Sequence, residues 1–96
     1  MALLSQDEIE RRLERLPDWE QVEQEITRNY VLTNFMEALR FVNKVEEMAE
    51  DADHHPDILI HSWNNVTITL STHSEGGLTE NDFELAEKID EAAEEF

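Results

Sequence analysis

Glycine and proline are scarce in this chain, and their scarcity limits how its helices and strands can be connected. The 96 residues include two glycines, Gly76 and Gly77, and two prolines, Pro17 and Pro56. Glycine and proline are the strongest breakers of regular structure. With so few of them, and with no repeat or linker, we expect short turns within a single domain over residues 1–96. No cysteine is present, so a disulfide scaffold is excluded and stability has to come from a hydrophobic core.

Three segments have the hydrophobic spacing of amphipathic helices. The first opens with a capping box of Ser5 and Glu8, and the last with a capping box of Thr79 and Asp82. Thr33 or Asn34 is expected to cap the middle helix, which should end near Asp51. The expected buried faces are Ile9, Leu13 and Leu16 in the first helix, Phe35, Ala38, Leu39, Val42, Val45 and Ala49 in the second, and Leu85, Ile89, Ala92 and Phe96 in the third.

Four further segments favour β-strands, and they come in two pairs. Residues 19–22 and 25–32 surround one tight turn, and residues 57–63 and 65–72 surround another. Apolar Val66, Ile68 and Leu70 alternate with polar residues, as in a strand that buries one face. The order α-β-β-α-β-β-α predicts an α+β fold, a four-stranded antiparallel sheet covered on one face by helices. Such a sheet leaves an edge and a second face that oligomerisation could cover.

The chain is strongly acidic, with 24 Asp and Glu against 7 Lys and Arg and a net charge of −17. Residues 1–48 carry −5, and residues 49–96 carry −12 with Lys88 as their single base. This charge repels phosphate backbones and anionic lipids, so direct nucleic-acid binding is not expected. An acid-rich, lysine-poor surface fits a protein that works in high salt, where screening reduces self-repulsion. A surface that binds a partner is the other interpretation.

The sequence contains no apolar run near the roughly 20 residues that a membrane span needs. Its first ten residues lack the basic segment of a signal peptide. We therefore expect a cytoplasmic protein with no membrane partner.

All four histidines, His54, His55, His61 and His73, lie within twenty residues. Imidazole titrates near neutrality and is the usual proton donor or acceptor in catalysis. The simpler interpretation of His54 and His55 is a polar loop with two solvated rings. Asp82 has a sufficient role as a capping residue. Trp63 either stacks on a flat ligand or belongs to the core.

Other chemistries fit less well. The zinc spacings of His with His or Cys are missing, and a calcium loop starting at Asp51 would place Pro56 where glycine is needed. Ser71 and Thr72 lack the glycines of a nucleophile elbow. The Gly76–Gly77 pair matches no phosphate-binding loop and has acidic neighbours. Acid–base catalysis by imidazoles and a carboxylate is the chemistry that these residues support, with no metal site.

The spacing of these residues resembles the signature of the pterin-4a-carbinolamine dehydratases. The similarity extends to the segment 67–73, to Gly77, Leu78 and Thr79, and to the order of elements along nearly the whole chain. The matching positions are Glu50, His54, His55, Pro56, Trp63, His73 and Asp82.

The resemblance implies an enzyme that dehydrates 4a-hydroxytetrahydrobiopterin to quinonoid dihydrobiopterin and so recycles the cofactor of aromatic amino acid hydroxylases. It implies no metal or organic cofactor, and a homodimer or homotetramer. The family's catalytic histidines fall on His54, His55 and His73. Expected substrate-binding residues are Pro56, Trp63, Thr72, Ser74, Glu75 and Asp82.

One position departs from the family pattern. Members often carry Glu directly after the third histidine, whereas this chain has Ser74 there and Glu75 next. A pterin contact at this point is therefore shifted or lost. The competing hypothesis for the whole chain is a dimerising regulatory module of the same fold that catalyses nothing.

Overall fold

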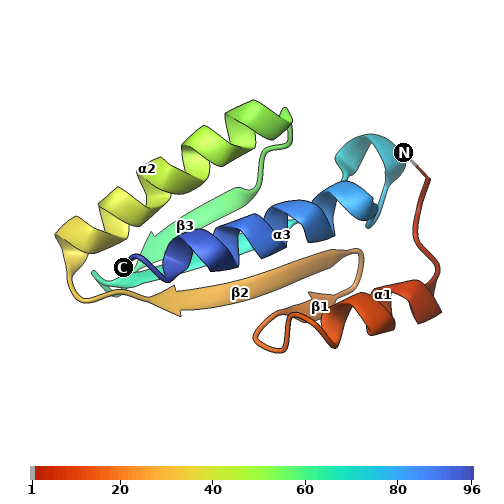
Figure 1. Ribbon diagram of the computed structural model, residues 1–96, viewed down its shortest axis with the longest axis horizontal. Helices are drawn as coiled ribbons and strands as arrows, with labels where there is room; N and C mark the ends of the chain where they lie inside the picture. The colour runs from red at the N-terminus through yellow and green to blue at the C-terminus, as the bar shows by residue number, and fades with distance from the viewer. Residues whose placement is uncertain (1) are drawn as a thin grey trace.

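A computed structural model describes residues 2–96, and its elements follow the expected order (Figure 1). Their bounds are α1 Gln6–Leu13, β1 Glu20–Val22, β2 Glu25–Val31, α2 Phe35–Ala52, β3 Asp57–His61, β4 Asn65–Leu70, a 3₁₀ turn η1 His73–Glu75, and α3 Glu80–Ala93.

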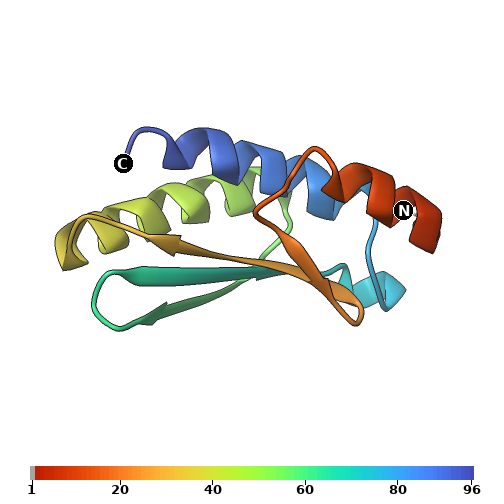
Figure 2. The same ribbon diagram turned by 90° about the horizontal axis from the view of Figure 1, so that it is seen from below.

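The four strands form one antiparallel sheet in the order β1-β2-β4-β3, so β1 and β3 are its edges. Figure 2 shows the three α-helices on the same side of this sheet. The predicted α+β class and the sheet covered on one face are therefore confirmed.

The core lies between the sheet and the helices. In β4 the alternation holds, because Val66, Ile68 and Leu70 are fully buried while Thr67 and Thr69 between them are not. The two capping boxes also form as predicted, at Ser5 with Glu8 and at Thr79 with Asp82.

The buried face of α2 agrees with the prediction at Ala38, Val45 and Ala49 and differs toward the start of the helix. Phe35 and Leu39 are exposed, Phe35 by 51%, while Phe41 is fully buried beside Val45 and Ala49. The set that contains Phe35 and Leu39 and the set that contains Phe41 both have helical spacing, so periodicity alone did not show which of them faces the core. The helix is rotated so that the ring of Phe41, and not that of Phe35, contacts Tyr30 of β2 and Phe96 near the C-terminus.

Several elements are shorter than expected. α1 ends before Leu16, which is buried in the following turn, and α3 ends before Phe96, which packs on Phe41. β3 ends at His61, so Trp63 lies in the turn after it and not in the strand. The core interpretation of Trp63 is wrong, because the side chain is 62% exposed.

The acceptor atom Asp90 Oδ1 joins α3 to the sheet. It accepts hydrogen bonds from Trp19 Nε1 at 2.9 Å, from Arg28 Nη1 at 2.8 Å and from the Tyr30 hydroxyl. Burial and the bond to Asp90 raise the pKa of Tyr30 far above its ordinary value. This cluster holds α3 in place, and the N-terminal end of that helix carries Asp82.

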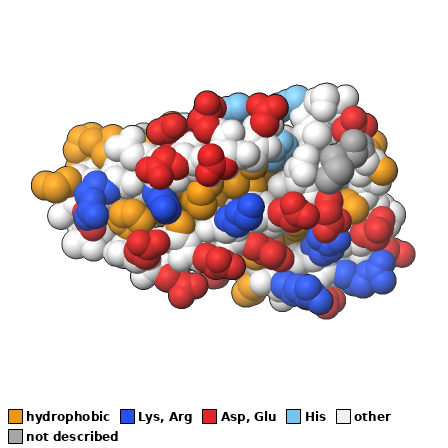
Figure 3. Space-filling view, turned by 45° about the horizontal axis from the view of Figure 1, so that its top comes forward, with side chains coloured by type: hydrophobic (Ala, Val, Ile, Leu, Met, Phe, Trp, Pro, Cys, Tyr) orange, Lys and Arg blue, Asp and Glu red, His pale blue; other side chains and the backbone are white. Residues whose placement is uncertain are grey.

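Acidic side chains cover much of the face drawn in Figure 3, with basic ones between them. At −17 these charges repel one another, and salt screens that repulsion. Among residues 2–96 no helix has the length and apolar character that a membrane crossing requires.

We expect the melting temperature to rise steadily as NaCl is increased from about 50 mM to about 2 M. Screening lowers the electrostatic cost of the folded state because the Debye length falls from about 10 Å near 0.1 M to about 3 Å at 1 M. Thermal unfolding followed by circular dichroism measures this, with sucrose as a control for non-ionic stabilisation. A melting temperature independent of salt contradicts the high-salt hypothesis.

Candidate active site

The candidate site lies at the end of the sheet where β3 begins and β4 ends. Antiparallel pairing of Asp57 with Thr69 puts the residues just before β3 beside those just after β4. The N-terminus of α3 reaches the same place, since Thr79 and Asp82 contact Thr72. The segment before β3, the segment after β4 and the start of α3 therefore meet here, although they are far apart in the sequence.

The end of α2 places His54. Asp53 adopts the left-handed conformation, with φ of 49°, and ends the helix. The backbone N–H of His54 then donates to the Ala49 carbonyl at 3.0 Å. Pro56 follows and keeps the chain extended into β3. The ring of His54 is consequently turned toward α3 and its side chain is only 11% exposed.

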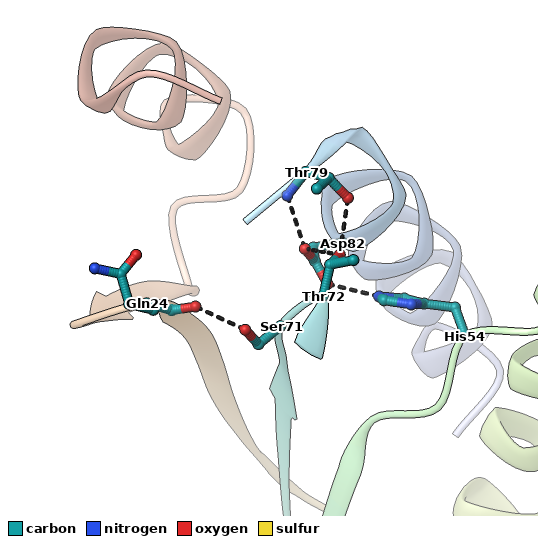
Figure 4. Close-up of polar contacts among 6 residues, drawn as sticks. All are labelled: Gln24, His54, Ser71, Thr72, Thr79 and Asp82. Atoms are coloured by element: carbon teal, nitrogen blue, oxygen red, sulfur yellow. Dashed lines mark hydrogen bonds and ion pairs between the residues drawn. The ribbon is translucent and has the colours of Figure 1, made fainter. Parts of the chain in front are cut away.

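Asp82 is the centre of a buried polar network, drawn in Figure 4. Its side chain is completely buried. Oδ1 lies 2.6 Å from His54 Nε2, while Oδ2 accepts from the Thr72 hydroxyl at 2.8 Å and from the Thr79 backbone N–H at 2.9 Å. A buried carboxylate needs such donors, and the helix N-terminus also favours its negative charge.

The protons in this network can be assigned by counting donors. Thr72 has one hydroxyl proton and gives it to Asp82, so in the 2.8 Å contact between the two threonine hydroxyls Thr79 is the donor. An ionised carboxylate only accepts, so His54 Nε2 carries a proton.

His55 and His73 are the exposed members of the site. His55 Nε2 lies 2.5 Å from Glu50 Oε2, and both side chains are more than half exposed. His73 begins the 3₁₀ turn after Thr72 and is exposed.

The two glycines close the turn that carries His73. Gly76 has φ of 74°, which suits glycine. A Cβ on Gly77 would lie 3.0 Å from Oε1 of the Gln24 side chain, so any larger residue here would have to displace that side chain.

The other residues that we expected to contact a ligand fall into two groups. Pro56, Ser74 and Glu75 lie at the surface or half-buried near the histidines in the chain, where a ligand can reach them. Thr72 and Asp82 are buried and use their oxygens on one another and on His54. The Thr79 hydroxyl is a further member of this network that was not predicted from the sequence, although the capping box had already singled out that residue.

Trp63 lies at the other end of β3. His61 and Asn65 pair at the base of the hairpin, and Trp63 is at its tip. Six residues of extended chain separate His55 from His61, which corresponds to about 20 Å. Within one chain, therefore, Trp63 does not reach His55.

Surface hollows, one of them of about 600 Å³ between α1 and α3, are lined by residues other than His54, His55 and His73. No group of three or more His, Asp or Glu side chains among residues 2–96 is arranged to hold a metal ion. In this arrangement the buried carboxylate of Asp82 fixes the imidazole of His54, while the imidazoles of His55 and His73 lie at the surface.

The chain has close relatives of known family. A family described as Pterin 4 alpha carbinolamine dehydratase matches residues 2–92. A Picosynechococcus protein provisionally named pterin-4-alpha-carbinolamine dehydratase is 50% identical over 88 residues, which cover 92% of this chain and 95% of the relative. A Thermomicrobium roseum protein with the same provisional name is 47% identical, with coverage of 97% and 99%.

Solved structures agree with these relatives. The structure of a transcriptional coactivator/pterin dehydratase from Brucella melitensis superposes with a TM-score of 0.90 at 35% identity, covering 95% of this chain and 98% of that chain. A pterin dehydratase-like protein described as a RuBisCO assembly factor shares the fold, with a TM-score of 0.67 at 20% identity over 79% of this chain and 89% of its own. By sequence match and by fold, this chain belongs to the pterin 4 alpha carbinolamine dehydratase family.

Proposed function

We propose that this protein dehydrates 4a-hydroxytetrahydrobiopterin to quinonoid dihydrobiopterin by histidine acid–base catalysis, and that it recycles the cofactor of aromatic amino acid hydroxylases. The observation that carries the proposal is the contact of His54 with Asp82, which prepares one imidazole to take up a proton. Family membership supports the pterin as substrate class.

The reaction needs one proton delivered and one removed. An imidazolium protonates the 4a-hydroxyl as the C4a–O bond breaks, because hydroxide is a poor leaving group. The N5 lone pair forms the new C4a=N5 bond and water departs. A neutral imidazole then accepts the proton from N5, so the sum of the steps is loss of one water molecule.

The environments of the histidines favour different roles. His54 suits the base, since the positive charge it gains at Nδ1 is stabilised by the Asp82 carboxylate on Nε2. We assign the acid to His55, whose ring is exposed at the surface with Nε2 2.5 Å from Glu50 Oε2. His73 is the other candidate for the acid. The two imidazoles differ in their surroundings, since His54 is largely buried against Asp82 and His55 is exposed beside Glu50.

We expect His55→Ala and His73→Ala each to lower the dehydration rate at least about tenfold, since a general acid or base contributes about 10²–10⁴-fold. Both side chains are exposed, so the fold should survive. Stopped-flow absorbance with freshly generated 4a-carbinolamine measures the rate, and circular dichroism checks the fold. His61→Ala is the matched control, because His61 hydrogen bonds to Asn29 and Thr67 on the sheet. Near-wild-type rates in both variants would remove this mechanism.

The same assay distinguishes catalysis from the non-catalytic alternative. A regulatory module of this fold needs no buried carboxylate bonded to an imidazole, so the Asp82 network favours turnover. If the wild-type protein does not accelerate dehydration over the buffer reaction at any pH from about 6 to 9, the proposed function is wrong.

A further inference from the structure

The turn that carries His73 projects from a buried base. Residues 73–76 are exposed, whereas Thr72 and Gly77 on either side of them are buried. These two residues form an antiparallel bridge, in which the Thr72 N–H donates to the Gly77 carbonyl at 2.8 Å. The His73 side chain is exposed, so its place depends on the backbone of this turn. Whatever fixes Thr72 and Gly77 therefore also fixes His73.

Two parts of the chain hold this base, and they lie on opposite sides of it (Figure 4). On one side Thr72 belongs to the Asp82 network. On the other side lies Gln24, at the tip of the hairpin between β1 and β2. The Gln24 carbonyl accepts a hydrogen bond from the Ser71 hydroxyl at 2.9 Å, and its side chain lies against Gly77.

The bond from Ser71 to Gln24 occurs where regular strand pairing has ended. The last paired residues of β2 and β4 at this end of the sheet are Ile26 and Leu70. Beyond them, the Ser71 hydroxyl joins the two segments by donating to the main chain of Gln24. This bond therefore fixes the start of the His73 turn at a place where the ladder of backbone hydrogen bonds no longer does.

The hairpin tip is itself held in an uncommon conformation. Glu23 has φ of 56°, a value that hairpin turns usually reach with glycine or asparagine. Its carbonyl accepts from Gln21 Nε2 at 3.0 Å, and Gln21 exchanges two amide hydrogen bonds with Gln6 of α1, at 2.8 and 3.2 Å. Residues in sparsely populated conformations persist where their surroundings determine them, and they tend to occur at functional sites. The tip is thus tied to α1 on one side and to the His73 turn on the other.

We propose that Gln24 is a positioning residue for the dehydration, and that it acts by holding the His73 turn through Ser71 and Gly77. This inference rests on the proposed function. Gln24 touches no reacting atom in this account, and its role is to keep the imidazole of His73 where it can exchange a proton with the pterin. A shift of about 1 Å in a reacting group can lower a rate about 10²-fold, so even a partly released turn should slow the reaction.

Ser71→Ala and Gln24→Ala remove the two contacts one at a time. We expect each change to lower kcat about fivefold and to alter KM less than about twofold, because His73 is misplaced while the other groups of the site remain. Ser71→Thr keeps the hydroxyl and should retain most of the activity. Stopped-flow absorbance with 4a-carbinolamine measures the rates.

Thr69→Val is the matched control. Thr69 lies two residues before Ser71, and its hydroxyl contacts the Thr27 hydroxyl at 3.1 Å inside the β2–β4 ladder. Losing this contact should change kcat less than about twofold, because backbone hydrogen bonds already hold the strands there. Equal losses of kcat in Ser71→Ala and Thr69→Val would overturn the proposal.

A double-mutant cycle distinguishes positioning of His73 from a general loss of stability. In a His73→Ala background, Ser71→Ala and Gln24→Ala should have no further effect on kcat, because the group that they position is gone. Losses that multiply in this background would reject the inference, and so would a His73→Ala protein as fast as the wild type.

Hydrogen exchange tests the same contacts without turnover. The buried Thr72 N–H, which donates to the Gly77 carbonyl, should exchange about tenfold faster in Ser71→Ala, while the N–H of Ile68 in the middle of β4 keeps its rate. Unchanged exchange at Thr72 in a protein that turns over rejects this inference alone. A wild-type protein without turnover rejects the proposed function, and the inference with it.

Discussion

We expect Asp82→Asn to lower the dehydration rate constant by about 10²–10³-fold and to leave the secondary structure intact. One Asp82 oxygen accepts from Thr72 and Thr79, and the other faces His54 Nε2. The single carbonyl oxygen of Asn satisfies the two donors, so its NH₂ group faces His54. His54 then cannot keep its proton on Nε2, and no negative charge stabilises the imidazolium. Loss of a general base costs about 10²–10⁴-fold.

Glu80→Gln is the matched control for this prediction. Glu80 also lies in the first turn of α3 and carries the same charge, but it pairs with Arg12 of α1. Its removal should change the rate by less than about twofold, since partly exposed ion pairs contribute little. Equal losses in the two variants would show that the overall charge of the helix end matters, and not the contact with His54.

Phe41→Ala has the largest expected effect on stability. The ring is fully buried, with its centroid 4.8 Å from that of Tyr30 and 5.6 Å from that of Phe96. Truncating such a ring costs about 3–5 kcal/mol through lost transfer energy and the cavity left behind. The total free energy of unfolding of a small domain is about 5–15 kcal/mol. This variant should therefore be close to unfolding at 37 °C.

Urea unfolding at fixed protein concentration measures the effect, and Phe35→Ala is its control. The same change in the same helix should cost less than about 1 kcal/mol, because Phe35 is half exposed. A larger loss for Phe35 than for Phe41 would show that the helix face first expected from periodicity is the buried one.

The elements were predictable because their signals are local. Capping boxes at Ser5 and Thr79, alternation in β4 and short turns each depend on residues close together in the chain. The rotation of α2 was not predictable, since Phe35 and Phe41 both have helical spacing and the choice depends on packing against β2. The exposure of Trp63 likewise depends on where the β3–β4 turn begins.

The sequence singles out candidate site residues but does not predict how they are arranged. For Asp82 the sequence offered a capping role and a role in catalysis as alternatives. The structure shows one oxygen bonded to the cap and the other to His54, so the two contacts coexist. That His54 and not His55 faces Asp82 depends on the left-handed residue Asp53, which no spacing rule indicates.

The most direct test is a double-mutant cycle of His54→Ala and Asp82→Asn, measured as the stopped-flow rate of 4a-hydroxytetrahydrobiopterin dehydration. If Asp82 acts through His54, the double variant is as slow as His54→Ala alone, while the wild-type protein is at least about a hundredfold faster. Independent losses that multiply, or a His54→Ala protein as fast as the wild type, would contradict the account.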